Sequence, residues 1–317
     1  MDNIAQKIDP DTIKKELDKC RFVRTTNFEN NDIYIFDAHQ CPDLMKEVGR
    51  LREISFRDSG GGSGKALDID EYDLMDNPYR QIIVWNPRED EIVGGYRYFK
   101  LKDAEKRTGG RYKIFTVRKF KPSDKFVEEY MPYTIELGKS FIQPKYQPAE
   151  NPRKGIFSLD TLWDGLGALI VDNPDVKYFY GSVSLYLHYD RKARDLLLWF
   201  LHKYFDDREN LVEAHNPQLV ASKQEHPDSF FTGKDFNEDF SKLNKAIRAR
   251  GESIPPLIKA YMSLSSTMKT FGIARNPDFT DKVEGIGILL TIDDIYPSKK
   301  QRHVETYLKQ KEKQASW

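Results

Sequence analysis

The segment 133–142 restricts the fold of this 317-residue chain more than any other segment. It reads YTIELGKSFI, and successive side chains of a strand point to opposite faces. Ile135, Leu137 and Lys139 would then share one face, while Glu136 would share the other with threonine, glycine and serine. A strand buried on both faces would not carry a carboxylate among such small residues. We therefore expect one covered face and open space beside Glu136.

Two interpretations of Glu136 are open. In the first, the small neighbours leave room for a substrate, Gly138 permits a bulge or a close backbone contact, and the carboxylate acts as a general base. In the second, this face of the strand meets solvent and the glutamate has no catalytic role.

The composition predicts a soluble globular protein and favours no class of charged partner. Hydrophobic residues make up 39% of the chain and charged residues 32%. Lysine plus arginine and aspartate plus glutamate both number 50, so the net charge favours neither nucleic acid nor membrane binding. Only local patches could provide such binding. The longest apolar run, at 196–201, is far too short to cross a bilayer.

The cysteines and the first residues predict a cytoplasmic location. Cys20 and Cys41 are the only cysteines, and their spacing fits neither a metal site nor a disulfide framework. Residues 1–20 are charged and lack the apolar centre of a signal peptide, so we expect none. The six histidines show no ligand spacing such as H-E-x-x-H, so we expect no catalytic metal.

Hydrophobic periodicity and turn residues predict a layered α/β fold. Helices are expected at 11–19, 42–57, 123–130, 158–171, 189–205 and 255–272. Strands are expected at 33–36, 81–85, 91–101, 133–142, 177–185 and 283–292. This order favours a mixed sheet flanked by helices, with an antiparallel front half and a crossover back half.

We expect a single domain with four parts. These are a helical N-terminal extension at 1–30, a core at 31–205, a part completing the sheet at 206–297 and a basic tail at 298–317. The tail has a formal charge of +4. It either binds an acidic protein or an anionic membrane, or is a solvated and partly disordered end.

The glycine-rich segment DSGGGSGK at 58–65 does not satisfy the phosphate-loop pattern. That pattern needs a glycine where Ser59 stands, and a serine or threonine where Ala66 follows Lys65. We therefore expect a mobile loop or an active-site lid. The acidic residues that follow, at 68–76, lack the calcium-loop pattern and are typical of a solvated loop.

Two arginines occupy positions that indicate specific partners, which are carboxylates for Arg97 and an aromatic ring for Arg52. Arg97 lies in an apolar strand beside a Gly-Gly pair, where a guanidinium group needs paired acids. Arg52 precedes Phe56 by four residues and shares its helix face. With Asp70 and Asp73 the arginines could form one network, which is either purely structural or shapes a pocket for a zwitterion.

The order and spacing of these residues resemble the acyl-homoserine-lactone synthases, which have the GNAT acyltransferase fold. The shared series is Arg52-x-x-x-Phe56, Asp70-x-x-Asp73, Val93-Gly94-Gly95-Tyr96-Arg97 and Glu136-x-x-Lys139. A closer resemblance is to the amino-acid N-acyltransferases that start ornithine-lipid and glycine-lipid synthesis, often labelled hemolysin-like. Phrases similar to theirs stand at 92–97, 136–140, 162–166 and 254–261, and the resemblance covers residues 44–295.

Three departures from the family pattern matter. Lys139 stands where the family usually has arginine, which weakens a bidentate role there. The glycine-rich insertion between Phe56 and Asp70 is unusual. The segment 151–155 lacks the full glycine-rich coenzyme A loop, which fits a carrier protein whose phosphopantetheine arm bears a single phosphate.

The resemblance implies an N-acyltransferase without a resident cofactor. The donor would be a (3-hydroxy) fatty acyl group on acyl carrier protein or coenzyme A, and the acceptor would be the α-amino group of glycine or ornithine. Glu136 would remove the amine proton, and backbone N–H groups of its strand would hold the oxyanion. The implied substrate-binding residues are Arg52, Phe56, Asp70, Asp73, Arg97 and Lys139. The implied phosphopantetheine and carrier-protein loop contains Arg153, Lys154, Gly155 and Ser158, with Ser158 as a helix N-cap.

Alternatives stay open at this point. The enzyme could make a signal instead of a lipid, and a non-catalytic protein of this fold could bind carrier protein or the inner membrane. The proton donor for the leaving thiolate is unassigned, with Tyr186 and Tyr189 as candidates. An N-acyl amino acid in lipid extracts would favour the enzyme.

Overall fold

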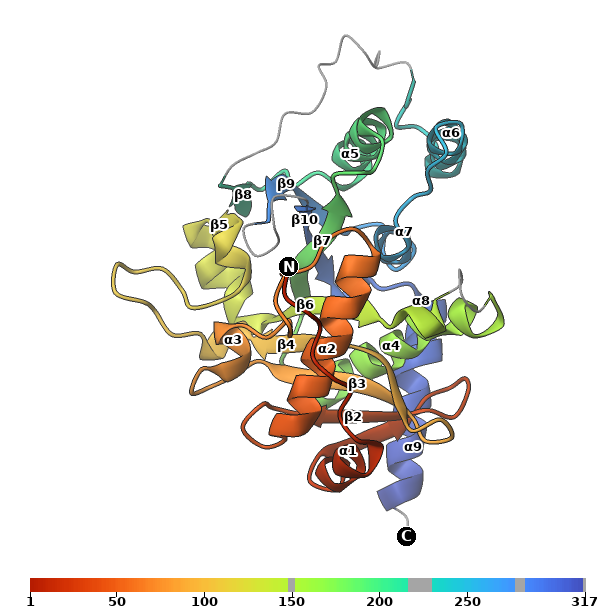
Figure 1. Ribbon diagram of the computed structural model, residues 1–317. Coiled ribbons are helices and arrows are strands. Elements are labelled where there is room, and N and C mark those ends of the chain that lie inside the picture. Colours follow the sequence, from red (N-terminus) through yellow and green to blue (C-terminus); the bar gives the residue numbers. More distant parts are fainter. Residues whose placement is uncertain (148–151, 216–229, 277–282, 316–317) are drawn as a thin grey trace. The chain divides into compact units, whose positions relative to one another are not determined.

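The computed structural model describes residues 1–147, 152–215, 230–276 and 283–315, which form two compact units (Figure 1). The first unit comprises Met1–Ala104, Tyr133–Lys177 and Ile295–Trp317, and the second comprises Glu105–Pro132 and Tyr178–Asp294. The chain therefore leaves the first unit twice and returns to it twice. The second return, between Asp294 and Ile295, lies close to the expected start of the tail at residue 298, and no unit boundary lies at residue 205.

The first unit is built on five antiparallel strands in the order β1-β2-β3-β4-β6. The strands are β1 (Arg21–Thr25), β2 (Asp32–Phe36), β3 (Arg80–Asn86), β4 (Glu91–Lys100) and β6 (Thr134–Ile142). The β3–β4 hairpin confirms the expected turn. The strand β1 lies in the N-terminal segment that was expected to be helical.

Helices cover both faces of this sheet. They are α1 (Pro10–Leu17), α2 (Pro42–Asp58), α3 (Glu71–Leu74), α4 (Pro152–Asp172), α8 (Pro297–Lys300) and α9 (Thr306–Ala315). Figure 1 shows α2 in front of the strands with α1 beside it, and α4 behind them with α9. The helix α2 begins at a proline, as expected, and its apolar stripe of Leu44, Val48 and Leu51 is buried.

Glycines allow α4 to approach both the sheet and the C-terminal segment. A Cβ atom at Gly165 would lie 2.8 Å from Ile82 Cδ1, and one at Gly167 would lie 2.3 Å from the carbonyl oxygen of His303. The second obstacle is backbone, so no side chain fits at Gly167 without moving the C-terminal segment. His303 itself is buried in a π-helical turn between α8 and α9.

The C-terminal segment is therefore a packed part of the first unit rather than a disordered tail. Two of its cations are also paired with acids of α4, Arg302 with Asp160 and Lys311 with Asp172. Less of the formal charge is available to a partner than the sequence suggested.

The second unit has its own strands and helices. The strands β7 (Tyr178–Tyr186) and β9 (Lys269–Arg275) flank β10 (Val283–Thr291), and β5 (Phe120–Pro122) pairs with β8 (Val212–Ala214), all antiparallel. The helices are α5 (Arg191–Phe205), α6 (Phe236–Arg248) and α7 (Pro256–Met262). Aromatic contacts of Phe200 with Phe236 and Phe240 join α5 to α6.

Two helix predictions are wrong at one end. The helix expected at 255–272 ends at Met262, and Gly272 (φ +72°), which was expected to end it, lies at a bulge in β9. The helix expected to start at Ser158 starts at Pro152, which suits the first helical position. Among the helices in the described part of the chain, none combines the length and apolar character needed to cross a bilayer.

Candidate active site

The strand β6 contains a bulge that its sequence alternation conceals. Across the β4–β6 pairing, Lys139 and Ser140 together oppose the single residue Tyr96. Lys139 adopts the left-handed backbone conformation, with φ +50°, which few non-glycine residues adopt. The sequence pointed to Gly138 for an irregularity, but its neighbour carries it.

Glu136 is fully buried, so the solvent-facing interpretation of this strand is wrong. The residues of β6 are buried from Thr134 to Lys139, and the open face expected beside Glu136 is absent from this part of the structure. Glu136 Oε2 accepts a hydrogen bond from the hydroxyl group of Tyr79, which is also fully buried. A carboxylate removed from water needs such a donor.

Arg97 lies at the centre of the acidic network that the sequence predicted. Its Nη1 atom is 2.7 Å from Asp70 Oδ1 and 3.1 Å from Asp73 Oδ2. Burial lowers the pKa of Arg97, but the two carboxylates outweigh burial and hold that pKa above its ordinary value. Burial raises the pKa of Asp70, yet Arg97 and then Lys139 hold it well below its usual range. Arg97 and Asp70 are therefore both charged at neutral pH.

Arg52 joins the same network from α2. Its Nη1 atom lies 3.3 Å from Asp73 Oδ2, and its Nη2 atom donates to the side-chain oxygen of Gln81. Gln81 in turn donates to Asp73 Oδ1 over 3.1 Å. Both Arg52 and Arg97 are fully buried and held by carboxylates, as a buried guanidinium group requires.

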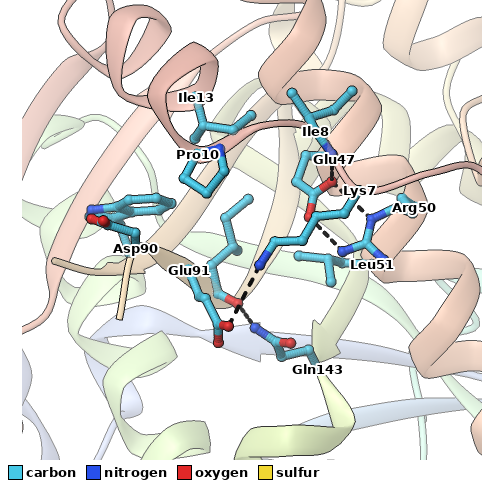
Figure 2. A pocket seen from close by; sticks show the side chains of 12 residues that line it. Lys7, Ile8, Pro10, Ile13, Glu47, Arg50, Leu51, Asp90, Glu91 and Gln143 are labelled. Atoms are coloured by element: carbon cyan, nitrogen blue, oxygen red, sulfur yellow. Dashed lines mark hydrogen bonds and ion pairs between the residues drawn. The ribbon is translucent and has the colours of Figure 1, made fainter. Parts of the chain in front are cut away.

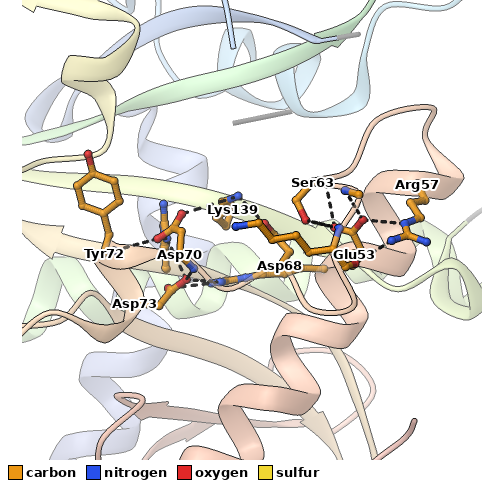
Figure 3. Close-up of polar contacts among 12 residues, drawn as sticks. Glu53, Arg57, Ser63, Asp68, Asp70, Tyr72, Asp73 and Lys139 are labelled. Carbon is orange, nitrogen blue, oxygen red and sulfur yellow. Dashed lines mark hydrogen bonds and ion pairs between the residues drawn. The ribbon is translucent and has the colours of Figure 1, made fainter. Parts of the chain in front are cut away.

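Lys139 is paired inside the first unit (Figure 3). Its Nζ atom lies 2.7 Å from Asp68 Oδ1, 4.0 Å from Asp70 Oδ2 and 5.9 Å from the ring centre of Phe56. Within the described residues, Asp68 Oδ2 accepts no hydrogen bond. Asp68 and Asp73 are buried, so the acidic segment is not the solvated loop that we expected. The contacts described above thus link all six predicted substrate-binding residues into one cluster.

The glycine-rich loop is held by Glu53, which differs from the mobile loop or lid expected. The fully buried Glu53 carboxylate accepts hydrogen bonds from the Ser63 N–H and hydroxyl groups, at 3.0 and 2.8 Å, and from the Gly64 N–H group at 2.9 Å (Figure 3). Burial raises the pKa of Glu53, but Arg57 and these loop donors outweigh burial and lower it. The loop N–H groups that could bind phosphate here bind the chain's own carboxylate.

The predicted carrier-protein residues fall partly outside the description. Arg153, Lys154 and Gly155 are in the first turn of α4. Only their helical backbone is described, and their side chains are not. Ser158 is buried inside the helix, and its hydroxyl group donates to the carbonyl oxygen of Tyr146 over 2.9 Å. Ser158 therefore does not cap the helix.

Lys145, which precedes these residues, is bound by the β3–β4 hairpin. Its Nζ atom lies 2.8 Å from Glu89 Oε2 and 2.8 Å from Glu91 Oε2. These hydrogen bonds hold its pKa above the ordinary value. Its charge is largely compensated before any partner approaches.

The two candidate proton donors belong to the second unit. The Tyr189 hydroxyl group donates to the carbonyl oxygen of Ser253 over 3.0 Å, and burial raises its pKa. Tyr186 stacks on the ring of His188. No contact described here assigns either tyrosine to the leaving thiol.

Comparison with known proteins identifies the family of this chain. Residues 51–153 match the family model described as an acetyltransferase (GNAT) domain. A glycine N(alpha)-acyltransferase of Bacteroides thetaiotaomicron is 47% identical over 308 residues, covering 97% of this chain and 91% of the relative. A glycine N(alpha)-acyltransferase of Phocaeicola vulgatus is 45% identical over 310 residues, covering 98% of this chain and 95% of the relative. This chain belongs to the glycine N(alpha)-acyltransferase family.

Membership in this N-acyltransferase family confirms the predicted enzyme class and the GNAT-type α/β fold. Among solved structures, the AHL synthase LasI matches 48% of this chain and 71% of its own, with 13% identity and a TM-score of 0.31.

A separate pocket of the N-acyltransferase lies near the other end of β4 and β6 (Figure 2). Its lining includes Lys7, Glu47, Arg50, Trp85, Glu91 and Gln143. The charges pair with one another, Arg50 with Glu47 at 2.6 Å and Lys7 with Glu91 at 3.7 Å. Gln143 is seven residues beyond Glu136, which corresponds to about 20 Å along a strand. We therefore do not assign this pocket to the acyl transfer.

Two residues of the candidate site escaped the sequence analysis. A signal existed for Gln81, which pairs with Arg97 across β3 and β4, because a polar residue inside an apolar strand indicates a buried partner. No comparable signal existed for Tyr79. It precedes its strand and has the pattern of an ordinary core aromatic residue.

Proposed function

We propose that this chain transfers a (3-hydroxy) fatty acyl group from acyl carrier protein to the amino group of glycine. The observation that carries the proposal is the identity of 47% and 45% with two proteins named glycine N(alpha)-acyltransferase, each along nearly the whole chain. Ornithine is the competing acceptor, and coenzyme A is the competing carrier of the donor.

Glu136 is the general base in this proposal. The amino group of glycine is mostly protonated near neutral pH and must lose a proton to become a nucleophile. Glu136 takes this proton, directly or through water, and the nitrogen attacks the thioester carbonyl carbon. The carbon–sulfur bond then breaks and the thiol leaves with a proton. The hydrogen bond from Tyr79 supports this role, because it fixes the direction of the carboxylate.

The bulge at Lys139 and Ser140 is the proposed oxyanion site. Backbone N–H groups at a bulge leave the regular ladder and can point toward a ligand. The tetrahedral intermediate carries its negative charge on the former carbonyl oxygen, which such donors would stabilise. The position of the bulge three residues after Glu136 supports this assignment.

The arginine–aspartate network is the proposed frame of the acceptor site. The exposed fraction of the Asp70 side chain is 17%, against 3% for Asp68 and 0% for Asp73. Asp70 is therefore the member of this group that an incoming ammonium group can approach. Arg97 holds Asp70 in position through a hydrogen bond to Oδ1.

The first turn of α4 is the proposed site for the phosphate of the phosphopantetheine arm. The N-terminus of a helix carries unpaired N–H groups and a partial positive charge, and α4 is 21 residues long. Arg153 and Lys154 in this turn would add the positive charge that an acidic carrier protein needs.

The acceptor and the donor are tested with purified protein. Acyl carrier protein loaded with a 3-hydroxy fatty acyl chain is offered with glycine or with ornithine, and the products are identified by mass spectrometry. We expect N-acylglycine, and slower use of the same acyl chain on coenzyme A. Preference for ornithine would contradict the acceptor, and the absence of any N-acyl amino acid would contradict the function.

The base assignment is tested by Glu136→Gln, with Glu128→Gln as the control at an exposed glutamate. The first variant should lose about 10²-fold or more in turnover with an unchanged fold, because the amide cannot take up the amine proton. The control should behave like the unsubstituted protein. Full activity of Glu136→Gln would remove Glu136 from the mechanism.

The docking assignment has a matched pair of double substitutions. In the first variant, glutamate replaces Arg153 and Lys154 in the first turn of α4. In the control variant, glutamate replaces the exposed Arg191 and Lys192 in the first turn of α5. Only the first change should raise the KM for acyl carrier protein more than the KM for a short acyl-pantetheine. The difference should shrink as salt rises. Equal losses on both donors would assign the turn to the phosphate or to the fold.

A further inference from the structure

Tyr79 lies between α3 and β3, and its ring is confined by three neighbours. The ring stacks on Phe99, with centres 4.8 Å and planes 18° apart, and it meets Tyr72 edge-on at 5.7 Å. The guanidinium carbon of Arg97 lies 5.0 Å from the centre of the same ring. The side chain is fully buried, so these contacts fix the direction of its hydroxyl group.

This ring connects two parts of the site. Its hydroxyl group donates to Glu136 Oε2, and its face lies against Arg97, which Asp70 holds at 2.7 Å. Phe99, which stacks on the ring, is also the residue of β4 that pairs with Glu136 across the sheet. Of the stacked pair, Phe99 is therefore the strand partner of Glu136 and Tyr79 binds its carboxylate.

We propose that Tyr79 is a positioning residue for Glu136 in the acyl transfer, and that its hydrogen bond stabilises the carboxylate that accepts the amine proton. This inference rests on the proposed function, in which Glu136 is the general base. It also gives the charge network around Arg97 a role beside the base. Arg97 packs on the ring of Tyr79, and the hydroxyl group of this ring binds Glu136.

The hydrogen bond acts through the charge of the carboxylate. Burial favours the neutral form of a carboxyl group, and a neutral carboxylic acid cannot take up the amine proton. A phenol that donates to the carboxylate stabilises the charged form, and a cation close to the ring strengthens the phenol as a donor. The bond also holds one carboxylate oxygen, so the carboxylate presents a constant orientation to the amine.

The test is the pH profile of kcat/KM for glycine in Tyr79→Phe. Its acidic limb should move to higher pH by about one unit, because a hydrogen bond to a charged group contributes on this scale. At higher pH the difference from the unsubstituted protein should shrink. A loss that is the same at every pH, or no loss, would overturn the proposal.

Two further variants make the result specific. Tyr34→Phe, at a half-buried tyrosine of β2 that contacts Phe22, should leave the profile unchanged. Glu136→Gln in the same assay separates this inference from the proposed function. If Glu136→Gln keeps its activity, the base assignment fails. If it loses activity while Tyr79→Phe keeps the original profile, only the role of Tyr79 fails.

A substitution of opposite sign keeps the proposal testable if Tyr79→Phe does not fold. Site-specific replacement of Tyr79 by 3-fluorotyrosine retains the ring and the hydroxyl group but makes the phenol a stronger donor. The acidic limb should then move to lower pH. An unmoved limb in the folded, fluorinated protein would overturn the proposal.

Discussion

Lys139 and Asp68 form a buried ion pair at the residue where β6 departs from regular strand geometry. The Nζ and Oδ1 atoms are 2.7 Å apart, and each side chain is 3% exposed. The backbone of Lys139 is left-handed, with φ +50°, which costs a non-glycine residue about 1–2 kcal/mol. The surrounding contacts must outweigh this cost, and the ion pair is the shortest of the described side-chain contacts of Lys139. We infer that the pair helps to hold the bulge.

Lys139→Gly should be more stable than Lys139→Ala, the reverse of the order in a regular strand. Both variants leave the Asp68 carboxylate buried without its cation, so both should lose about 3 kcal/mol of unfolding free energy. Glycine adopts a left-handed backbone freely, which should make its variant about 1 kcal/mol more stable than the alanine variant. Urea unfolding at neutral pH measures both differences.

The reference for this order is the exposed Lys121 in β5, where the backbone is not left-handed. There alanine should be at least as good as glycine. If alanine is also the better residue at position 139, the bulge is not strained and the inference is wrong.

Much of the site could be predicted because charge inside an apolar strand allows few solutions. Arg97 required acids, and Asp70 and Asp73 are those acids. The bulge could not be predicted, since it depends on the pairing with β4 and on an ion pair to Asp68, 71 residues away in sequence. Tyr79 was missed for a related reason, because its contact with Glu136 spans 57 residues.

The fold was predictable where periodicity is strong and the ends carry clear signals. The helix α2 and the β3–β4 hairpin lie within a residue or two of their expected bounds. The strands β1, β5, β8 and β9 were missed, because strand formation depends on pairing with a neighbour more than on the strand's own composition. The pairing of β9 with β10 also overrode the helical pattern expected at 255–272.

The stabilised charge of the Asp70 carboxylate predicts that the unfolding free energy of the protein depends on pH. Arg97 and Lys139 hold the pKa of Asp70 below its usual range despite burial. The stabilisation is therefore present above the unfolded-state pKa, about 4, and is lost as the pH falls below that value. Asp70→Asn can still cap α3, and it should be less stable than the unsubstituted protein by about 2 kcal/mol at pH 7.

The difference between the two proteins should shrink as the pH falls from about 5 to about 3. Unfolding in urea across this range measures it. Asp103→Asn, at an exposed aspartate, serves as the control and should show no such trend. A constant difference for Asp70→Asn would mean that the carboxylate is not selectively stabilised in the folded state.

Asp164 fastens two distant segments to α4 and should be important for stability. Its carboxylate accepts hydrogen bonds from the Asn27 N–H and side-chain amide groups, at 2.8 and 2.6 Å, and lies 2.8 Å from His303 Nδ1. Asp164→Ala should cost about 3–5 kcal/mol, because it leaves buried donors unpaired. Asp160→Ala, one turn earlier, breaks a pair with the half-buried Arg302 and a 3.7 Å contact with His303 Nε2, and it should cost about 1 kcal/mol. Equal costs in thermal unfolding would contradict this distinction.

The two cysteines of the chain should form a disulfide when a disulfide donor is supplied. Cys20 follows α1 and Cys41 precedes α2, and their sulfur atoms lie 3.2 Å apart. One thiolate attacks oxidised glutathione and releases one reduced glutathione, and the other cysteine then displaces the second. Burial raises the pKa of both thiols, so the reaction should be slow near pH 7 and faster at higher pH.

Mass spectrometry of the intact protein should show the loss of two hydrogen atoms without retained glutathione, and the bond should raise the unfolding free energy by about 3 kcal/mol. Cys41→Ser is the control, since it leaves Cys20 able to form only a mixed disulfide with glutathione. Because Cys20 is partly exposed and Cys41 is buried, Cys20 should react first. Two retained glutathiones on the unsubstituted protein would show that the sulfur atoms do not meet, and the prediction would be wrong.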